Sequence, residues 1–216
     1  MVEEIKSLCT GRLKKFGDYD FFENIQVLSP TKKGLLGTRE LNKELQLCLN
    51  PYSDKKLERH MNGVIYRVGD RVMQIKNNYD IYWEKERNGR TEHGTGVFNG
   101  EFGTIKNIYE IEKQLEICFD DKKTAIYEFS ELDQIEHSYV VTIHKAQGSE
   151  FDVVIMAIPP SVPMLLTRNL LYTGITRAKK LLILVGNDKV LEYMIHNVDS
   201  KKRNTGLKYK LENGLG

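Results

Sequence analysis

The chain of 216 residues has few cysteines, and they form no recognisable pattern. Cys9, Cys48 and Cys118 lie far apart, without a Cys-x-x-Cys pair and without a histidine at the spacing of metal ligands. This distribution argues against a disulfide framework and against a zinc site, and it fits a reducing compartment. We therefore predict no metal site and a cytoplasmic location.

Excess charge and long apolar runs are also missing. The 32 basic and 30 acidic residues give a formal charge of +2, so net charge indicates no nucleic-acid partner, and any basic surface must be local. No apolar stretch approaches the roughly 20 residues that a membrane helix needs, and we expect no membrane partner. With 40% hydrophobic and 29% charged residues, the chain suits one medium domain or two small ones.

Both ends of the chain alternate strand and helix patterns. An apolar run at 25–28 leads into a loop rich in Ser, Pro and Gly, and leucines at 41, 45 and 49 then form one helical stripe. The pattern returns later as a strand at 153–158, a helix at 167–178, a strand at 181–185 and a helix at 188–196 capped by Asp188. Such alternation predicts an α/β fold with a parallel sheet covered on both faces.

The middle of the chain, 62–137, has a different pattern. It contains short β-rich pieces separated by turn signals at Asn99-Gly100 and at 120–123, as expected for a small antiparallel barrel. The polar, glycine-bearing segment 81–96 is predicted to be a mobile loop. The sequence thus predicts an α/β domain at 1–61 and 138–216, interrupted by an inserted β module at 62–137.

Two polar clusters flank predicted strands of the α/β part. The first, "TIHKAQGSE" at 142–150, follows a strand at 139–143, and we expect its polar groups at the carboxyl edge of the sheet, where open α/β folds bind ligands. Solvated loop residues are the alternative. The second cluster places Arg177 near the end of an apolar helix, where an unpaired guanidinium is costly. A planar guanidinium at a sheet edge suits a phosphate.

These clusters carry a resemblance to a known family. "VVTIHKAQGSEFDVVIM" resembles motif V and "LLYTGITRAKK" motif VI of superfamily 1 helicases, and "IQVLSPTKKGLLGTRELNKELQLCLNP" is similar to the motif IV region of RecD-like helicases, the exodeoxyribonuclease V alpha-chain type. The resemblance covers 24–211 and the C-terminal half of such enzymes. It implies a RecA-like motor domain of the P-loop NTPase type with an inserted Src-homology-3-like barrel. One departure is Lys33, where the family often has Arg.

The phosphate-binding loop that a nucleotide motor needs is not found in the sequence. A Walker A motif requires Gly followed by Lys, and here no Gly precedes a Lys. The pair Asp120-Asp121 follows an apolar strand as in a Walker B motif, but it runs directly into a Lys-Lys turn. We therefore expect the chain alone to be inactive, with ATP and Mg²⁺ shared with a missing N-terminal RecA-like domain.

In the helicase interpretation, the site residues divide by ligand. Arg177 is the predicted arginine finger and the catalytic residue, while Gly148, Glu150 and Lys33 are assigned to the nucleotide. Contacts to DNA are assigned to Ser29, Thr31, Thr142, His144, Lys145, Gln147, Lys76 and Trp83. The alternatives are a tight turn for Gly148, a capping or surface carboxylate for Glu150, a solvated Lys145 and a plain turn at 29–31.

The β module is expected to hold DNA through its turns. Aromatic rings beside basic groups suit single-stranded DNA, and the alternative places the rings in the core and the lysines in solvent. The candidates for this face are Arg67, Arg71, Lys76, Lys106, Lys122 and Lys123, with Tyr66, Tyr79, Tyr82 and Trp83 between them.

The resemblance predicts the C-terminal part of an ATP-dependent DNA helicase that moves 5′ to 3′ on single-stranded DNA and unwinds duplex DNA in recombination or repair. Its expected partners are DNA, the N-terminal motor domain, and RecB- and RecC-like subunits. A stand-alone nucleic-acid-binding module without motor activity is the rival interpretation. A fragment of a conjugative relaxase helicase is a third.

Overall fold

The computed structural model describes residues 1–87, 89–160 and 165–198, and it confirms the α/β fold with a parallel sheet. Its sheet has the strand order β11-β1-β12-β13, and every neighbouring pair in it is parallel. The strands are β1 (Ile25–Ser29), β11 (Val140–Thr142), β12 (Phe151–Ala157) and β13 (Ala178–Val185). β1 lies centrally and is buried along its whole length, as its unbroken apolar pattern predicts.

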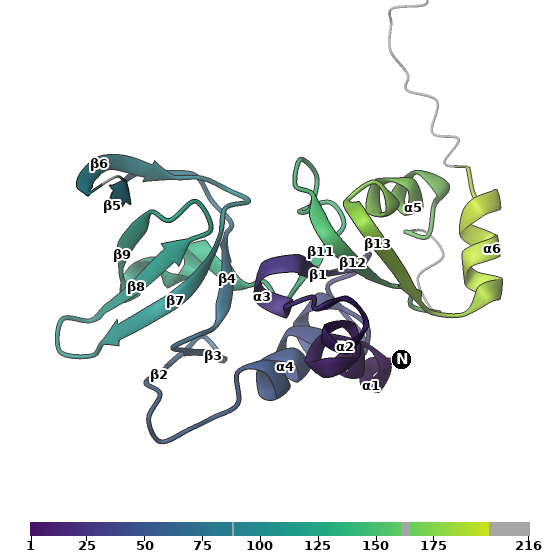
Figure 1. Cartoon of the computed structure of the whole chain (residues 1–216), viewed down its shortest axis with the longest axis horizontal. Helices are drawn as coiled ribbons and strands as arrows, with labels where there is room; N and C mark the ends of the chain where they lie inside the picture. Colours follow the sequence, from purple (N-terminus) through teal and green to yellow (C-terminus); the bar gives the residue numbers. More distant parts are fainter. Residues whose placement is uncertain (88, 161–164, 199–216) are drawn as a thin grey trace, which may run out of the picture.

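Helices cover both faces of this sheet (Figure 1). One face holds α1 (Val2–Ser7), a π-helical turn (Leu8–Arg12), α2 (Leu13–Gly17), α3 (Phe21–Asn24) and α4 (Thr38–Leu49). The other holds α5 (Arg168–Ile175) and α6 (Asp188–His196). α5 and β13 differ from the predicted bounds, because the helix ends at Ile175 and the strand begins at Ala178. The cap of α6 is Asn187 and not Asp188.

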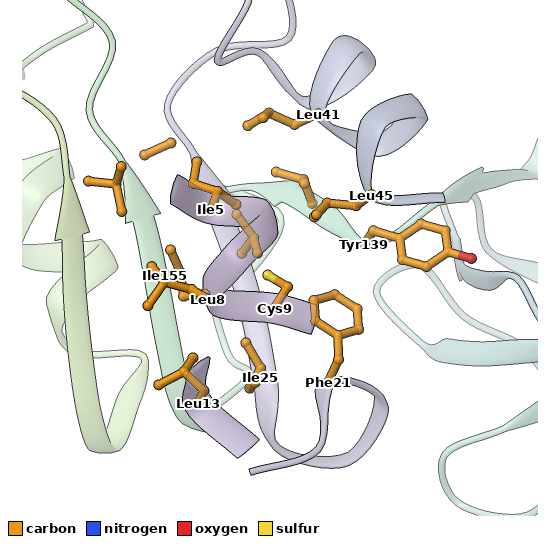
Figure 2. Close-up of a cluster of buried hydrophobic side chains, with 14 of the residues drawn as sticks. Ile5, Leu8, Cys9, Leu13, Phe21, Ile25, Leu41, Leu45, Tyr139 and Ile155 are labelled. Atoms are coloured by element: carbon orange, nitrogen blue, oxygen red, sulfur yellow. The ribbon is translucent and has the colours of Figure 1, made fainter. Parts of the chain in front are cut away.

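The N-terminal helices complete the core of the sheet, which the sequence did not predict. Figure 2 shows Ile5, Leu8 and Leu13 reaching toward the sheet residues Ile25 and Ile155. All five side chains are almost fully buried. The segment before β1 is therefore an integral part of the α/β domain.

The β module contains a hairpin and a seven-stranded antiparallel sheet. The hairpin joins β2 (Glu58–Met61) and β3 (Val64–Arg67). The larger sheet has the order β10-β4-β7-β8-β9-β5-β6, formed by β4 (Arg71–Gln74), β5 (Asn78–Arg87), β6 (Arg90–Val97), β7 (Phe102–Tyr109), β8 (Gln114–Phe119), β9 (Thr124–Glu128) and β10 (Ile135–His137). Within the described residues the pairing does not return from β6 to β10, so closure into a barrel stays a prediction.

The mobile loop predicted at 81–96 is wrong, because this segment is the β5–β6 hairpin. Both strands carry polar residues on their outer face. The alternation of apolar and polar residues that indicates a strand was therefore not evident in the sequence. On the inner face the Trp83 ring lies against Gly94, its register partner, where a Cβ would come within 2.3 Å of the ring. Glycine therefore makes room for the indole in this hairpin.

The module packs directly on the parallel sheet. Met73 of β4 and Phe102 of β7 are buried in the same cluster as Leu28 and Val154 of the sheet. Phe102 also makes an edge-to-face contact with Phe151, with ring centroids 5.8 Å apart. This apolar contact fixes the module beside the strands that carry the motif residues. In the described part of the chain, no helix has the length and apolar character needed to cross a membrane.

Candidate functional site

The predicted site residues lie at two opposite edges of the parallel sheet. Ser29 and Thr142 are register partners at the carboxyl edge, whereas Phe151 and Ala178 pair at the amino edge. Ser29 is level with the end of β12, six residues after Phe151, so at about 3.3 Å per residue the two edges are separated by about 20 Å. The expectation that all of 142–150 lies at the carboxyl edge is therefore wrong. The segment starts there and crosses one face of the sheet, and its own residue Ala146 is buried in the core cluster on that face.

At the carboxyl edge, Ser29 and Thr31 shape the loop before α4. The Ser29 side chain is fully buried, and its hydroxyl donates to the Leu36 carbonyl at 2.6 Å. The Thr31 hydroxyl accepts from the Lys33 amide at 3.3 Å, and the Lys33 side chain is exposed. The Ser29 hydroxyl is thus used within the turn, while Thr31 and Lys33 remain open to a ligand, and the assignment of Ser29 and Thr31 to DNA stays a prediction.

The start of the 142–150 segment lies beside that loop. The Thr142 hydroxyl accepts from the Lys145 amide at 3.3 Å, which closes a turn after β11. His144 and Gln147 are exposed. The Lys145 ammonium donates to Glu136 of β10 at 2.7 Å, so Lys145 has a partner from the β module and is not simply solvated; its predicted contact to DNA stays a prediction.

The end of the segment and Arg177 meet at the amino edge. Gly148 has a φ of +88°, which accounts for glycine by turn geometry, and Glu150 forms an exposed ion pair with Lys179 at 3.6 Å. Arg177 donates through Nη1 to the Ser149 carbonyl at 3.0 Å and through Nε to the Thr173 carbonyl at 3.1 Å. The guanidinium therefore joins the end of α5 to the end of the 142–150 segment.

Lys33 lies apart from the other residues assigned to the nucleotide. It follows β1 at the carboxyl edge, while Glu150 and Arg177 precede strands at the amino edge. No hydrogen bond or ion pair of the described residues joins the Lys33 side chain to either of them. The structure thus groups Lys33 with the DNA candidates.

The predicted turn face of the module is wrong for several members. Arg67, Arg71, Lys123 and Tyr66 are buried, with exposures of 4 to 6%. They cannot line a surface that binds DNA. Exposed members are Lys76, which pairs with Asp133, together with Lys106, Lys122, Tyr79 and Tyr82.

Trp83 is half-buried and packs against the module core. The ammonium of buried Lys123 lies 5.9 Å from the Trp83 ring and 5.4 Å from the Phe119 ring. This cation–π arrangement holds the hairpin on the sheet, and it supports the structural alternative for Trp83.

Sequence reasoning missed a buried carboxylate between the two parts of the chain. Asp70 is fully buried and accepts hydrogen bonds from Gln46 at 2.6 Å, Asn50 at 2.7 Å and Tyr139 at 2.8 Å. His137 lies 3.0 Å from the same carboxylate, and the Arg67 amide donates at 2.7 Å. We call these six residues the Asp70 cluster.

The charge of Asp70 is stabilised within this cluster. Burial alone raises the pKa of Asp70, but the hydrogen bond and charge of His137 and the amide donors lower it below its ordinary value overall. Burial also raises the pKa of Tyr139, which keeps its phenol protonated as a donor. The sequence does contain one signal for this cluster, because Asp70 lies in a Gly-Asp-Arg turn directly before an apolar strand.

Comparison with known proteins gives two family matches. The model described as the ATP-dependent RecD-like DNA helicase SH3 domain matches residues 41–119. The model described as the UvrD-like helicase C-terminal domain matches residues 137–185. Together they cover the β module up to residue 119 and the part of the sheet that carries the 142–150 segment and Arg177.

Several curated relatives match most of the chain. It is 36% identical to an uncharacterized protein of Methanocaldococcus jannaschii, over 90% of this chain and 18% of that protein. It is 33% identical to the ATP-dependent RecD2 DNA helicase of Deinococcus radiodurans, over 72% and 19%. It is 28% identical to the RecBCD enzyme subunit RecD of Haemophilus influenzae, over 88% and 26%. The chain thus spans about a quarter or less of these relatives' length.

A solved structure shares the fold. The Pif1 helicase from Bacteroides, in complex with ADP-AlF3 and ssDNA, superposes with a TM-score of 0.51 and 11% identity, over 99% of this chain and 50% of that one. The parallel sheet and the matched domains define a helicase-like C-terminal domain. More particularly, the chain resembles the C-terminal half of RecD-like helicases, which confirms the resemblance seen in its motifs.

Proposed function

We propose that this chain is the C-terminal part of an ATP-dependent DNA helicase that translocates on single-stranded DNA. The observation that carries the proposal is the separation of two polar sites on one sheet. Arg177 and Glu150 lie at the amino edge, and Thr142 and Lys145 at the carboxyl edge. A motor needs such a separation, because nucleotide and track must act on one rigid body without competing for the same groups.

At the amino edge, Arg177 offers a planar cation to a phosphate. Its guanidinium now bonds to carbonyl groups of two segments, Ser149 and Thr173. In the proposal, one N–H leaves its carbonyl for the γ-phosphate of ATP held by a first RecA-like domain, and stabilises the charge that develops there. Closure of the two motor domains would thereby change the contacts of Arg177 with both α5 and the 142–150 segment.

The acidic pair Asp120-Asp121 fits Mg²⁺ poorly. A magnesium ion takes oxygen ligands in a near-octahedral arrangement. Asp120 and Asp121 lie in the β8–β9 turn of the module and pair with Arg71 at 3.1 Å and Lys85 at 3.3 Å. Both carboxylates form ion pairs within the module, so a Walker B role for them is not supported. The cationic side of the ATP site is what this chain supplies.

At the carboxyl edge, hydroxyl and ammonium groups face a nucleic-acid strand in this proposal. His144 and Lys145 supply donors suited to phosphates, while the buried Thr142 shapes the turn that presents them. Translocation from 5′ to 3′, a role in recombination or repair and association with RecB- and RecC-like subunits are proposed from the similarity to RecD proteins. The name of the Haemophilus relative records a subunit of such a complex for that protein.

Replacement of Arg177 tests the proposed ATP site. In a longer protein that contains the first motor domain, Arg177→Ala should leave ATP affinity nearly unchanged and lower turnover by about 10³- to 10⁵-fold. Arg177→Lys should recover little, because an ammonium lacks the planar fork. The measurements are DNA-stimulated phosphate release and equilibrium binding of a fluorescent ATP analogue.

A control separates chemistry from folding. Lys179→Ala removes a neighbouring exposed cation that pairs only weakly with Glu150, and it should retain turnover within a few-fold. If Arg177→Ala hydrolysed ATP at the parental rate, Arg177 would be a structural link between α5 and Ser149. That result would remove Arg177 from the proposed ATP site.

A further inference from the structure

Two lysines from different loops share one carboxylate of the β module. The Lys145 ammonium lies 2.7 Å from one oxygen of Glu136, and the Lys32 ammonium lies 3.9 Å from the other. Lys32 precedes α4, and Lys145 follows β11, so the two loops leave adjacent strands at the carboxyl edge. Glu136 is the only acidic partner of either ammonium in the described residues.

Strand pairing fixes the backbone of Glu136, whereas its side chain is partly exposed to solvent. Glu136 pairs with Met73 in the sheet, and the next residue, His137, belongs to the Asp70 cluster. The Glu136 side chain is nevertheless 46% exposed, and the side chains of Lys32 and Lys145 are 52% and 24% exposed. Exposed ion pairs are weak, and an arriving anion therefore displaces such a carboxylate readily.

The shape of this place favours an anion that approaches from solvent. The groove beside the three side chains, which Thr38, Thr142 and Val141 also line, has a volume of only about 10 Å³. Such a space holds no more than about one water molecule. A phosphate must therefore bind on the open side, as one unit of a longer strand would.

We infer that Lys32 and Lys145 form a binding site for a backbone phosphate of single-stranded nucleic acid, and that Glu136 occupies this site until the strand replaces it. The inference rests on the proposed function, and it adds Lys32 and Glu136 to its residues. Glu136 comes from the module, and the lysines come from the motor domain. When the nucleic-acid strand binds, the two lysines thus exchange their ion pairs with Glu136 for contacts to a phosphate.

Removal of the Glu136 charge tests this inference in the chain itself. Glu136→Gln should bind a fluorescein-labelled dT20 about two- to fivefold more tightly at low salt, because the phosphate no longer competes with a carboxylate. The dependence of affinity on salt should also steepen. Lys32→Gln and Lys145→Gln should each weaken binding and lower the salt slope by about 0.7. Fluorescence anisotropy over a series of NaCl concentrations measures both quantities.

A matched variant and a combined variant show whether the effect belongs to Glu136 and its two lysines. Glu110→Gln deletes the same charge from an exposed ion pair with Arg59, at 3.4 Å, and should leave affinity unchanged. In the Lys32→Gln/Lys145→Gln background, Glu136→Gln should have no further effect, because the carboxylate acts through these lysines. Glu136→Ala should reproduce Glu136→Gln and controls for effects of the new amide.

The outcomes separate this inference from the proposed function. If the parental chain binds dT20 and Glu136→Gln binds no tighter, or Glu110→Gln tightens binding equally, the inference is wrong and the proposed function stands. If the parental chain fails to bind dT20, the inference is wrong, and the proposed function is decided separately by the Arg177 variants in the longer protein. A larger effect of Glu136→Gln on the affinity for ATP than for dT20 would assign the site to a nucleotide, which also overturns the inference.

Discussion

Gly148 is the residue in the 142–150 segment whose backbone geometry is most restrictive. Its φ of +88° is strained for any side chain, although no atom lies within 4 Å of the position of a Cβ. Gly148→Ala should therefore lower the free energy of unfolding by about 1 kcal/mol through backbone strain alone. Urea denaturation measures this change.

Gly11→Ala is the matched control for that variant. Gly11 also has open space around its Cβ position, but it lies within a helical turn where alanine is favoured. We expect unchanged or slightly higher stability, by up to about 1 kcal/mol. Equal losses in the two variants would show that φ is not the cause.

For single residues, the residue type indicated the kind of chemistry, but it did not indicate where in the fold the residue lies. An arginine near the end of an apolar helix indicated a partner for its guanidinium, and Arg177 bonds to carbonyl groups of two segments, while its role toward ATP stays a prediction. Its location at the amino edge was not predictable, because the sequence shows that a segment joins two strands but not that it crosses the sheet between them. The burial of Arg67 and Lys123 was equally hidden, since both depend on contacts between distant strands.

Among the elements, the Asp70 cluster links α4, the β module and the residues before β11. Replacing Asp70 by Asn removes the charge and places an amide against donors such as Asn50 and Gln46. We expect a loss of about 3 kcal/mol in the free energy of unfolding. Asp80→Asn, at an exposed position on β5, should change it by less than about 0.5 kcal/mol.

The same cluster predicts a dependence of stability on pH. Because the folded-state pKa of Asp70 lies below its ordinary value, its contribution is fully present above the unfolded pKa and is lost as pH falls below about 4. Urea titrations from pH 7 to pH 3 should show a smaller acid loss in Asp70→Asn than in the parental chain. Identical pH profiles would contradict a charged Asp70 in the folded state.

Elements with strong periodicity were predictable from the sequence, and others were not. The leucine stripe predicted α4, and the apolar run predicted β1, because both patterns reflect burial against one core. The β5–β6 hairpin was missed because its outer face is polar and Gly94 replaces a strand-forming residue opposite Trp83. The short helices before β1 carry too few turns to show a period.

For the whole molecule, the two sites on one sheet and the attached module form a single rigid arrangement. Met73 and Phe102 pack the module on the sheet, and the Asp70 cluster ties it to α4. The sequence patterns and the family resemblance both predicted a β module inserted in an α/β domain, whereas composition and net charge did not, and the placement of the two sites at opposite edges was not predicted.

The central claim is that this chain supplies only one side of an ATP site. The most direct test is the rate of ATP hydrolysis with saturating dT20, measured for the chain alone and for a longer protein that includes the first motor domain. We predict no DNA-stimulated hydrolysis by the chain alone and robust hydrolysis by the longer protein. Robust turnover by the chain alone would contradict the account, as would a longer protein that binds ATP and DNA but does not hydrolyse ATP.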